Sequence, residues 1–137
     1  MGKSRFVRFT LPPIVWAALI FIESSIPGND IPETPHGTDK LVHIVIYFIF
    51  CWLTFRALSN APSRVVAQMS FFIAIVLTIL YGFSDEFHQL FVPGRSADVY
   101  DLTADSIGGF LFLVIALFQR YRSGKGKNLH NSNGVKS

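Results

Sequence analysis

The sequence predicts an all-α integral membrane protein, a bundle of four transmembrane helices with both termini in the cytoplasm. Two features of the composition support the fold class: half of the 137 residues are hydrophobic, and only 15% are charged. Soluble domains carry about 25% charged residues, so this chain lacks the charge to cover a surface that faces water. A third feature, the distribution of lysine and arginine along the chain, predicts the orientation.

Four stretches predict membrane spans at 6–26, 41–58, 65–84 and 98–121. The first contains Pro12-Pro13 near its start, where proline costs least in a helix. The second and third are rich in Ile, Phe, Val and Leu. A helix of about 20 residues crosses the ~30 Å hydrocarbon core, because each residue adds about 1.5 Å.

The fourth span is the least regular, because only residues 107–118 are continuously apolar and such a stretch is too short to cross. Its helix must begin near Asp98 and carry acidic residues into the membrane. Gly108-Gly109 is expected to allow close helix packing and to have no chemical role. We expect one domain over 6–121, followed by a basic, disordered cytoplasmic tail over 122–137.

Ten of the twelve basic residues lie in the two termini or around the second loop, and only Lys40 and Arg95 lie in the other loops. The positive-inside rule therefore places both termini and the second loop in the cytoplasm. A cleaved signal peptide is the competing interpretation of the first stretch, but residues 23–27 lack a small-residue cleavage site. We expect no nucleic-acid partner, and the single Cys51 excludes an intramolecular disulfide.

All nine acidic residues lie between Glu23 and Asp105, so this topology places them on the outer side. Several polar residues recur at helical spacing, which puts them on one face of a helix. Ionisable groups in lipid normally face the bundle interior and pair with one another, so we expect one outward pocket, closed by Arg95. The members are Asp39, His43 and Tyr47 along the second helix from its outer end, Asp85, His88 and Gln89 at the outer end of the third, and Asp98, Asp101 and Asp105 in the fourth.

Such a pocket suits two kinds of chemistry. Oxygen and imidazole ligands bind Mg²⁺, Mn²⁺ or Zn²⁺, whereas a histidine oriented by a carboxylate moves protons without a metal. Simple structural roles are open as well. Asp39 could cap the second helix, His43 could be a buried histidine satisfied by a neighbour, and Asp98 could lie in a solvated first turn that favours the helix dipole.

Four motifs occur in order along the chain: D-K-L-V-H at 39–43, Y-G-F-S-D-E-F-H-Q at 81–89, F-V-P-G-R at 91–95 and D-L-T-A-D-S-I-G-G at 101–109. Over residues 16–118 the chain resembles the VanZ-like family of small bacterial membrane proteins. The resemblance implies a multi-pass protein of the cell membrane with a role in the cell envelope, since the family is named after a protein associated with low-level resistance to teicoplanin. The positions that match the family motif are Asp39, Lys40, His43, Asp85, Glu86, Gln89, Arg95, Asp98, Asp101 and Asp105.

We therefore expect the pocket to bind, and to act by hydrolysis or transfer on, the head group of an envelope lipid or lipid-linked precursor. A divalent cation is a candidate cofactor. His88 and Tyr47 are candidates because of their helical spacing from the other polar residues, more than because of the family motif. The candidate residues are His43, Glu86, Asp85 and His88 for catalysis, Lys40, Arg95, Gln89 and Tyr47 for substrate binding, and Asp101, Asp105, Asp98 and Asp39 for the metal.

Two other function classes compete with this expectation. The chain could be a non-catalytic lipid-binding or scaffold protein that acts on an envelope enzyme, with the polar residues joining the helices. It could also be a small transporter or proton-coupled channel. The transporter class is disfavoured because the cytoplasmic halves of the spans are nearly uncharged, so that no polar path crosses the membrane.

Overall fold

The computed structural model describes residues 2–31, 35 and 37–133, with side chains up to residue 122. All regular structure within these residues is helical. Four helices are long and apolar enough to cross a membrane, namely Lys3–Ser24, Thr38–Ser59, Ser70–Gln89 and Val99–Arg122. The prediction of an all-α fold with four candidate spans is confirmed.

The first span is a continuous helix with one wider turn. It consists of α1 (Lys3–Arg5), the π-helical segment η1 (Phe6–Thr10) and α2 (Leu11–Ser24). Pro12 and Pro13 stand in the first turn of α2 and cannot donate to the carbonyls four residues earlier. The unpaired carbonyls explain why the wider π turn directly precedes them.

The second span, α3 (Thr38–Ser59), begins three residues before the predicted start at 41. Gly37 occupies the N-cap position with φ 86°, a left-handed conformation that suits glycine. Asp39 therefore lies inside the first turn, and the alternative in which it caps the helix is wrong. The earlier start also brings Lys40 into the helix, where its position is set by the backbone.

The third span differs most from its predicted bounds of 65–84. A short helix, α4 (Arg64–Gln68), precedes it and ends at Met69, and the spanning helix is α5 (Ser70–Gln89). Hydropathy misses this break because the residues of α4 are largely apolar. Hydropathy also places the end of the third span too early. The polar residues in the last turns of α5 stay helical because they have partners inside the protein.

The fourth span belongs to α6 (Val99–Asn133), which continues well beyond the predicted end at 121. The backbone of α6 is described to Asn133, and residues 134–137 lie outside the described residues. No proline follows Pro93 in the sequence. The glycines after residue 121 cost only about 1 kcal/mol each in a helix, so nothing in this segment forces α6 to stop.

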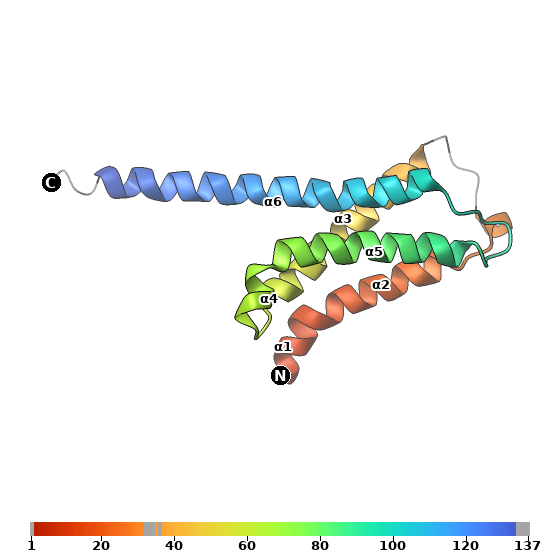
Figure 1. Cartoon of the computed structure of the whole chain (residues 1–137), viewed down its shortest axis with the longest axis horizontal. Helices are drawn as coiled ribbons and strands as arrows, with labels where there is room; N and C mark the ends of the chain where they lie inside the picture. Colours follow the sequence, from red (N-terminus) through yellow and green to blue (C-terminus); the bar gives the residue numbers. More distant parts are fainter. Residues whose placement is uncertain (1, 32–34, 36, 134–137) are drawn as a thin grey trace.

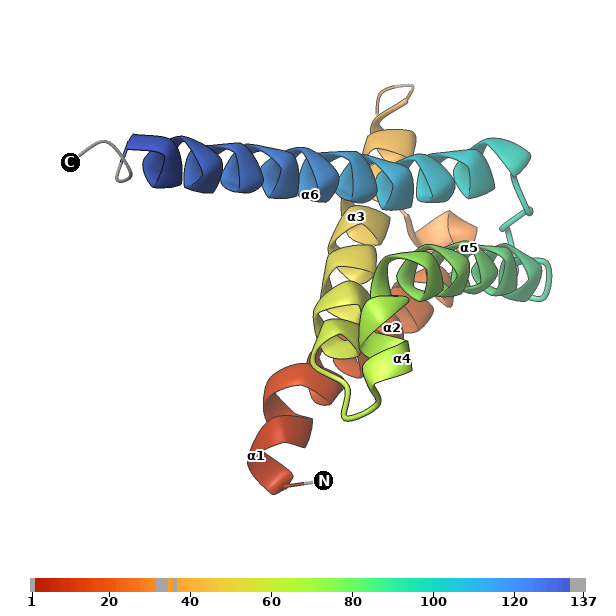
Figure 2. The same cartoon turned by 60° about the vertical axis from the view of Figure 1, so that its left-hand side comes forward.

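Helices α3 and α5 form the middle of the bundle. Helix α3 contacts α2, α5 and α6, whereas α2 makes no contact with α6 within the part of the chain that the structure describes. Figure 1 shows α2 and α6 on opposite sides of α3 and α5, with the basic half of α6 projecting beyond the other helices. In Figure 2 the α3–α6 crossing lies in the N-terminal half of α6, the half that carries the acidic residues.

Two apolar clusters hold the helices together, and hydrogen bonds to backbone carbonyls fasten α2 to its neighbours. Trp16 Nε1 donates to the Ile46 carbonyl at 3.0 Å, and the Tyr81 hydroxyl donates to the Ala17 carbonyl at 2.6 Å. These bonds tie α2 to the middle helices within an apolar setting, where water cannot replace the partner. The buried members of the clusters are Ile20, Tyr47 and Phe50 in one, and Cys51, Ala74 and Phe112 in the other.

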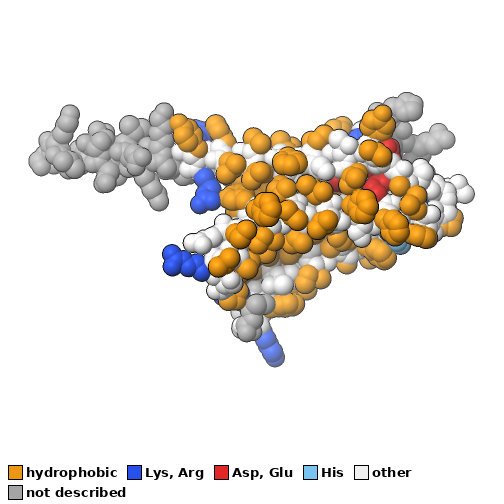
Figure 3. All heavy atoms as spheres, in the orientation of Figure 1, with side chains coloured by type: hydrophobic (Ala, Val, Ile, Leu, Met, Phe, Trp, Pro, Cys, Tyr) orange, Lys and Arg blue, Asp and Glu red, His pale blue; other side chains and the backbone are white. Residues whose placement is uncertain are grey.

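Charged side chains separate to the two ends of the bundle. Figure 3 shows lysine and arginine at the end where both termini lie and acidic groups at the opposite end, with an apolar surface between them. We call these the basic end and the acidic end. Lys40 and Arg95 are the exceptions, because both lie among acidic residues. That the basic end faces the cytoplasm remains a prediction of the positive-inside rule.

Cysteine labelling checks this orientation directly. Cys51 is fully buried, so its replacement by alanine provides an unreactive background. Ser96→Cys lies in the exposed α5–α6 connection at the acidic end, and Pro62→Cys lies in the exposed α3–α4 connection at the basic end. In intact cells a membrane-impermeant maleimide should label Ser96→Cys alone. Labelling of Pro62→Cys alone would reverse the orientation.

Candidate functional site

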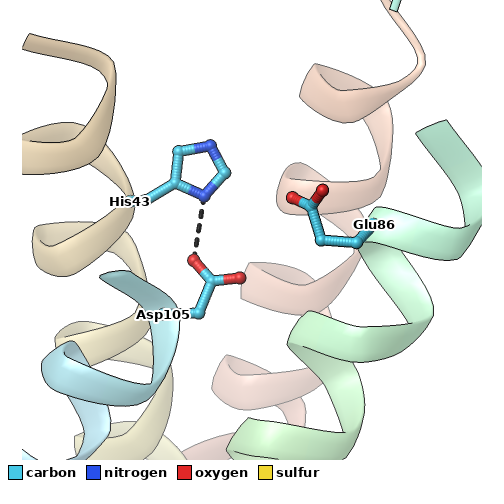
Figure 4. Close-up of side chains that lie close together, drawn as sticks. All are labelled: His43, Glu86 and Asp105. Carbon is cyan, nitrogen blue, oxygen red and sulfur yellow. Dashed lines mark hydrogen bonds and ion pairs between the residues drawn. The ribbon is translucent and has the colours of Figure 1, made fainter. Parts of the chain in front are cut away.

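Three titratable side chains converge at the acidic end, each from a different spanning helix. His43 on α3, Glu86 on α5 and Asp105 on α6 form what we call the central triad, shown in Figure 4. Each offers one ligand atom, and these atoms lie within 4.8 Å of one another. His43 Nδ1 and Asp105 Oδ1 are 2.8 Å apart, in hydrogen-bond contact. The Asp105 side chain is completely buried, and that of His43 is 14% exposed.

Asp105 reaches this position because α5 carries a glycine opposite it. A Cβ on Gly82 would lie 2.8 Å from Asp105 Oδ2, so any side chain there would displace the carboxylate. Gly82 is one turn before Glu86 and shares its helix face. The ring of Tyr47, also on α3, lies nearly parallel to that of His43, with the two ring centroids 6.3 Å apart.

Glu86 joins the central triad to the start of α6. Its Oε2 accepts a hydrogen bond from the Asp98 N–H at 2.7 Å, which satisfies one of the N–H groups at this helix start. Within the described residues, Glu86 Oε1, Asp105 Oδ2 and the Tyr47 hydroxyl are buried without a hydrogen-bond partner. Buried polar groups are normally paired, so two such oxygens on members of the central triad indicate a site with spare binding capacity.

A second group of charges surrounds Lys40, and we call it the rim group. The Lys40 ammonium lies 3.1 Å from Asp39 and 2.6 Å from Asp98, and it also contacts the Asp101 carboxylate. It therefore links α3 to α6. The hydrogen bond from Lys40, assisted by the Tyr100 N–H, holds the pKa of the Asp98 carboxyl below its ordinary value. Lys40 is occupied by the carboxylates of its own chain.

Asp85 and Gln89 form a separate buried pair. Gln89 Nε2 donates to Asp85 Oδ2 at 3.3 Å, one helical turn apart on α5. Both side chains are at least 95% buried. The pair was expected at the outer end of this span, and its burial shows why α5 continues to Gln89.

His88 and Arg95 point away from the central triad. His88 Nε2 lies 3.0 Å from the Ser25 hydroxyl, and its ring packs on Phe21 of α2. Arg95 donates to the carbonyls of Ile26 and Glu23, at 3.2 and 3.3 Å. Arg95 therefore fastens the α5–α6 connection to the end of α2 and does not close over the triad.

The structure thus distributes the predicted site residues over several groups. The four predicted metal ligands separate, because Asp105 joins the central triad while Asp39, Asp98 and Asp101 surround Lys40. Two residues that support the site, Gly82 and Ser25, were not predicted from the sequence. Gly82 lies four residues before Glu86, and this spacing could have identified it. No sequence signal connects Ser25 with His88.

An apolar groove opens toward the basic end, with a volume of about 850 Å³. Its walls come from α3, α5 and α6, and Gln119 and Arg120 are its polar residues. The groove begins at Phe48 and Phe112, which are five and seven residues beyond His43 and Asp105. At 1.5 Å per residue this is about 7 to 10 Å along the helix axes.

The comparisons with known proteins identify the family. The chain matches no curated protein and no solved structure. The model of the VanZ/LLP1 family matches residues 9–120, a range that contains all four predicted motifs and both residue groups at the acidic end. This match confirms the family resemblance, and the four candidate spans fit a membrane protein. We conclude that this membrane protein belongs to the VanZ/LLP1 family.

Proposed function

We propose that the chain lies in the cell membrane with its acidic end outward, and that it binds and modifies the head group of an envelope lipid or lipid-linked precursor there. The observation that carries the proposal is the central triad, since it places an imidazole and two carboxylates inside apolar helices with two buried carboxylate oxygens unpaired. Keeping such groups in a membrane domain costs a few kcal/mol, which favours a functional role.

The triad can carry out hydrolysis or group transfer. Asp105 accepts from His43 Nδ1 and so fixes the orientation of the ring, whose second nitrogen points away from Asp105 in Figure 4. In this arrangement His43 can exchange a proton with a substrate, and Glu86 is a second acid or base. Lys40 and Arg95, which we expected to hold a phosphate, are engaged with the protein itself, so a substrate phosphate needs another positive partner.

The surroundings of the triad favour a lipid over a soluble substrate. The spanning helices expose large apolar side chains along their length, so lipid would surround the domain that holds the triad. The apolar groove between α3, α5 and α6 begins within two helical turns of the triad and can accept an acyl chain. Both features favour a ligand with a polar head and an apolar tail.

Teicoplanin susceptibility tests the proposal, because family membership suggests a resistance-like role. The chain is expressed in a susceptible bacterium, and the inhibitory concentration of teicoplanin is measured. The wild-type chain should raise this concentration, whereas His43→Ala, Glu86→Gln and Asp105→Asn should each return it to the level without the chain. Removing a proton-transfer group typically lowers the rate by about 10²–10⁴-fold, which would abolish the effect.

His88→Ala is the matched control, because it removes a histidine at the same end that contacts α2 instead of the triad. It should retain the resistance of the wild type. All variants are compared at equal protein levels in the membrane fraction. Resistance from all three triad variants, or no increase from the wild-type chain, contradicts the proposal.

A non-catalytic scaffold is the second candidate function, and the rim group favours it. Lys40 ties α3 to α6 through three carboxylates, an arrangement that stabilises the bundle without any reaction. Asp105→Glu and Glu86→Asp separate the two functions, since each keeps the charge but moves the reacting oxygens. These variants should be inactive if the triad is catalytic and active if the chain is a scaffold.

A further inference from the structure

The donor atoms of the central triad match a metal site. We propose that His43, Glu86 and Asp105 bind one divalent transition-metal cation, with Zn²⁺ as the ion that fits best. Zinc is held by imidazole nitrogen and carboxylate oxygen at about 2.0–2.2 Å, and catalytic zinc sites use three protein ligands. Magnesium and calcium prefer six or more oxygen ligands and fit one imidazole and two carboxylates less well.

The spacing of the donors is compatible with a shared ion. Two ligands about 2.0–2.2 Å from one tetrahedral ion lie roughly 3.3–3.5 Å apart. His43 Nδ1 and Asp105 Oδ1 are 2.8 Å apart, and all three donor atoms lie within 4.8 Å of one another. Shifts of about an ångström, within the range of side-chain rotation, therefore bring the three donors around one ion.

Unpaired buried oxygens are an independent indication of a ligand. Glu86 is 95% buried and its Oε1 has no hydrogen-bond partner among the described residues. The same is true of Asp105 Oδ2, on a fully buried side chain, and Figure 4 shows this oxygen turned toward the helix that carries Glu86. A bound cation would satisfy lone pairs that the protein leaves unmatched.

The charge balance at the triad favours an added positive group. Two carboxylates face one imidazole, and buried charges are normally paired or bound to metal ions. Within the described side chains, the two basic residues of the acidic end are bonded elsewhere, Lys40 to the rim group and Arg95 to the end of α2. A divalent cation neutralises both carboxylates at once.

The ion would change how the triad serves the proposed function, because with His43, Glu86 and Asp105 as its ligands a water on the ion would take over the proton transfer that a metal-free triad performs. With three protein ligands, zinc keeps a fourth position for a water or a phosphate oxygen. It would thereby supply the positive partner that Lys40 and Arg95 do not offer. Only the role of the ion in a reaction rests on the proposed function. The binding of zinc itself is measurable without any lipid substrate.

Metal binding is tested on the full chain purified in detergent. The protein is stripped with a chelator, titrated with Zn²⁺ and analysed for bound zinc, and a parallel sample is loaded with Co²⁺ for absorption spectroscopy. The wild type should bind one zinc per chain and give the visible bands of four- or five-coordinate cobalt. Glu86→Gln and Asp105→Asn should weaken zinc binding by more than the roughly 10- to 100-fold expected for an outer-shell partner.

Two controls make the result specific. Asp39→Asn removes an exposed carboxylate of the rim group, and a variant with alanine at His36, His88 and His130 retains His43 as its single histidine. Both should bind zinc like the wild type. Each variant must elute as a single species with wild-type helical content, and the near-isosteric changes at Glu86 and Asp105 keep the test meaningful if His43→Ala fails to fold.

The results separate this inference from the proposed function. No zinc on the wild-type chain, or equal zinc on folded Glu86→Gln and Asp105→Asn, overturns the metal site while leaving a metal-free triad in place. One zinc on the triad in a chain whose triad variants still confer resistance supports the metal site and contradicts the proposed function.

Discussion

Replacing Gly108 with leucine is expected to prevent folding of the bundle, and replacing it with alanine to destabilise it. Gly108 of α6 packs directly against the backbone of α3. A Cβ at this position would collide with the Ile44 carbonyl oxygen and lie 2.9 Å from the Phe48 nitrogen. Backbone atoms cannot rotate away as side-chain ends do, so the two helices would have to separate.

The alanine variant separates packing from helix propensity. Alanine favours a helix over glycine by about 1 kcal/mol, whereas overpacking typically costs about 1–3 kcal/mol, and more where backbone must move. We expect a net loss of stability, measured as a lower midpoint of thermal unfolding in detergent. Because Ile44 follows His43 directly, the variant should also weaken zinc binding at the triad.

The adjacent Gly109 is the matched control. A Cβ there would lie 3.3 Å from the Thr78 Cγ2 and 3.6 Å from the Ile75 Cδ1, both side-chain atoms that can yield slightly. Gly109→Ala should therefore be neutral or slightly stabilising. Equal destabilisation by Gly108→Ala and Gly109→Ala would mean that the close α3–α6 contact is not specific to Gly108.

Replacing Lys40 with methionine is expected to destabilise the acidic end at neutral pH. The change removes the ammonium and leaves Asp39, Asp98 and Asp101 facing one another. Breaking a fully buried pair costs about 3–5 kcal/mol. Lys40 is 30% and Asp98 35% exposed, so solvent screening reduces the expected loss of stability to about 1–3 kcal/mol.

The loss should depend on pH, with a sign set by the carboxylates. Lys40 lowers the pKa of Asp98 in the folded protein, so the wild-type stabilisation is present above the unfolded pKa of about 4 and is lost as the pH falls through the folded value. In Lys40→Met the carboxylates repel until they are protonated. The difference in unfolding midpoint between wild type and variant should therefore be large at pH 7 and become small only at a pH below the lowered pKa of Asp98.

A compensating variant completes this test. Adding Asp98→Asn and Asp101→Asn to Lys40→Met removes two of the unpaired charges and should restore part of the stability at pH 7. The same deficit at both pH values, or no recovery in the combined variant, would show that Lys40 contributes packing of its stem instead of charge pairing.

The separation of the candidate site into groups could not be predicted from spacing alone. Asp98, Asp101 and Asp105 share a helical stripe, but a seven-residue stripe is about 10 Å long and contacts different neighbours at its two ends. The first two carboxylates meet Lys40 and the third meets His43. Periodicity assigns a face of a helix, whereas the partner at each level depends on how the other helices cross it.

The bounds of the third span show the same limit. Hydropathy averages over a window and ends the helix where polar residues begin, near position 84. In the folded chain α5 continues to Gln89, because Asp85, Glu86 and Gln89 are buried against other helices and not against lipid. The cost of a polar residue in a membrane domain depends on its surroundings, which a one-dimensional profile does not contain.

Composition, hydropathy and motif order were sufficient for the fold class, the number of spans, the family resemblance and the end of the bundle at which polar chemistry gathers. These properties follow from the cost of burying charge in lipid, which acts on each segment separately. The triad of His43, Glu86 and Asp105 depended on the tertiary structure. Three helices far apart in the sequence must pack at particular crossings, allowed by Gly82 and Gly108, before one atom from each can meet.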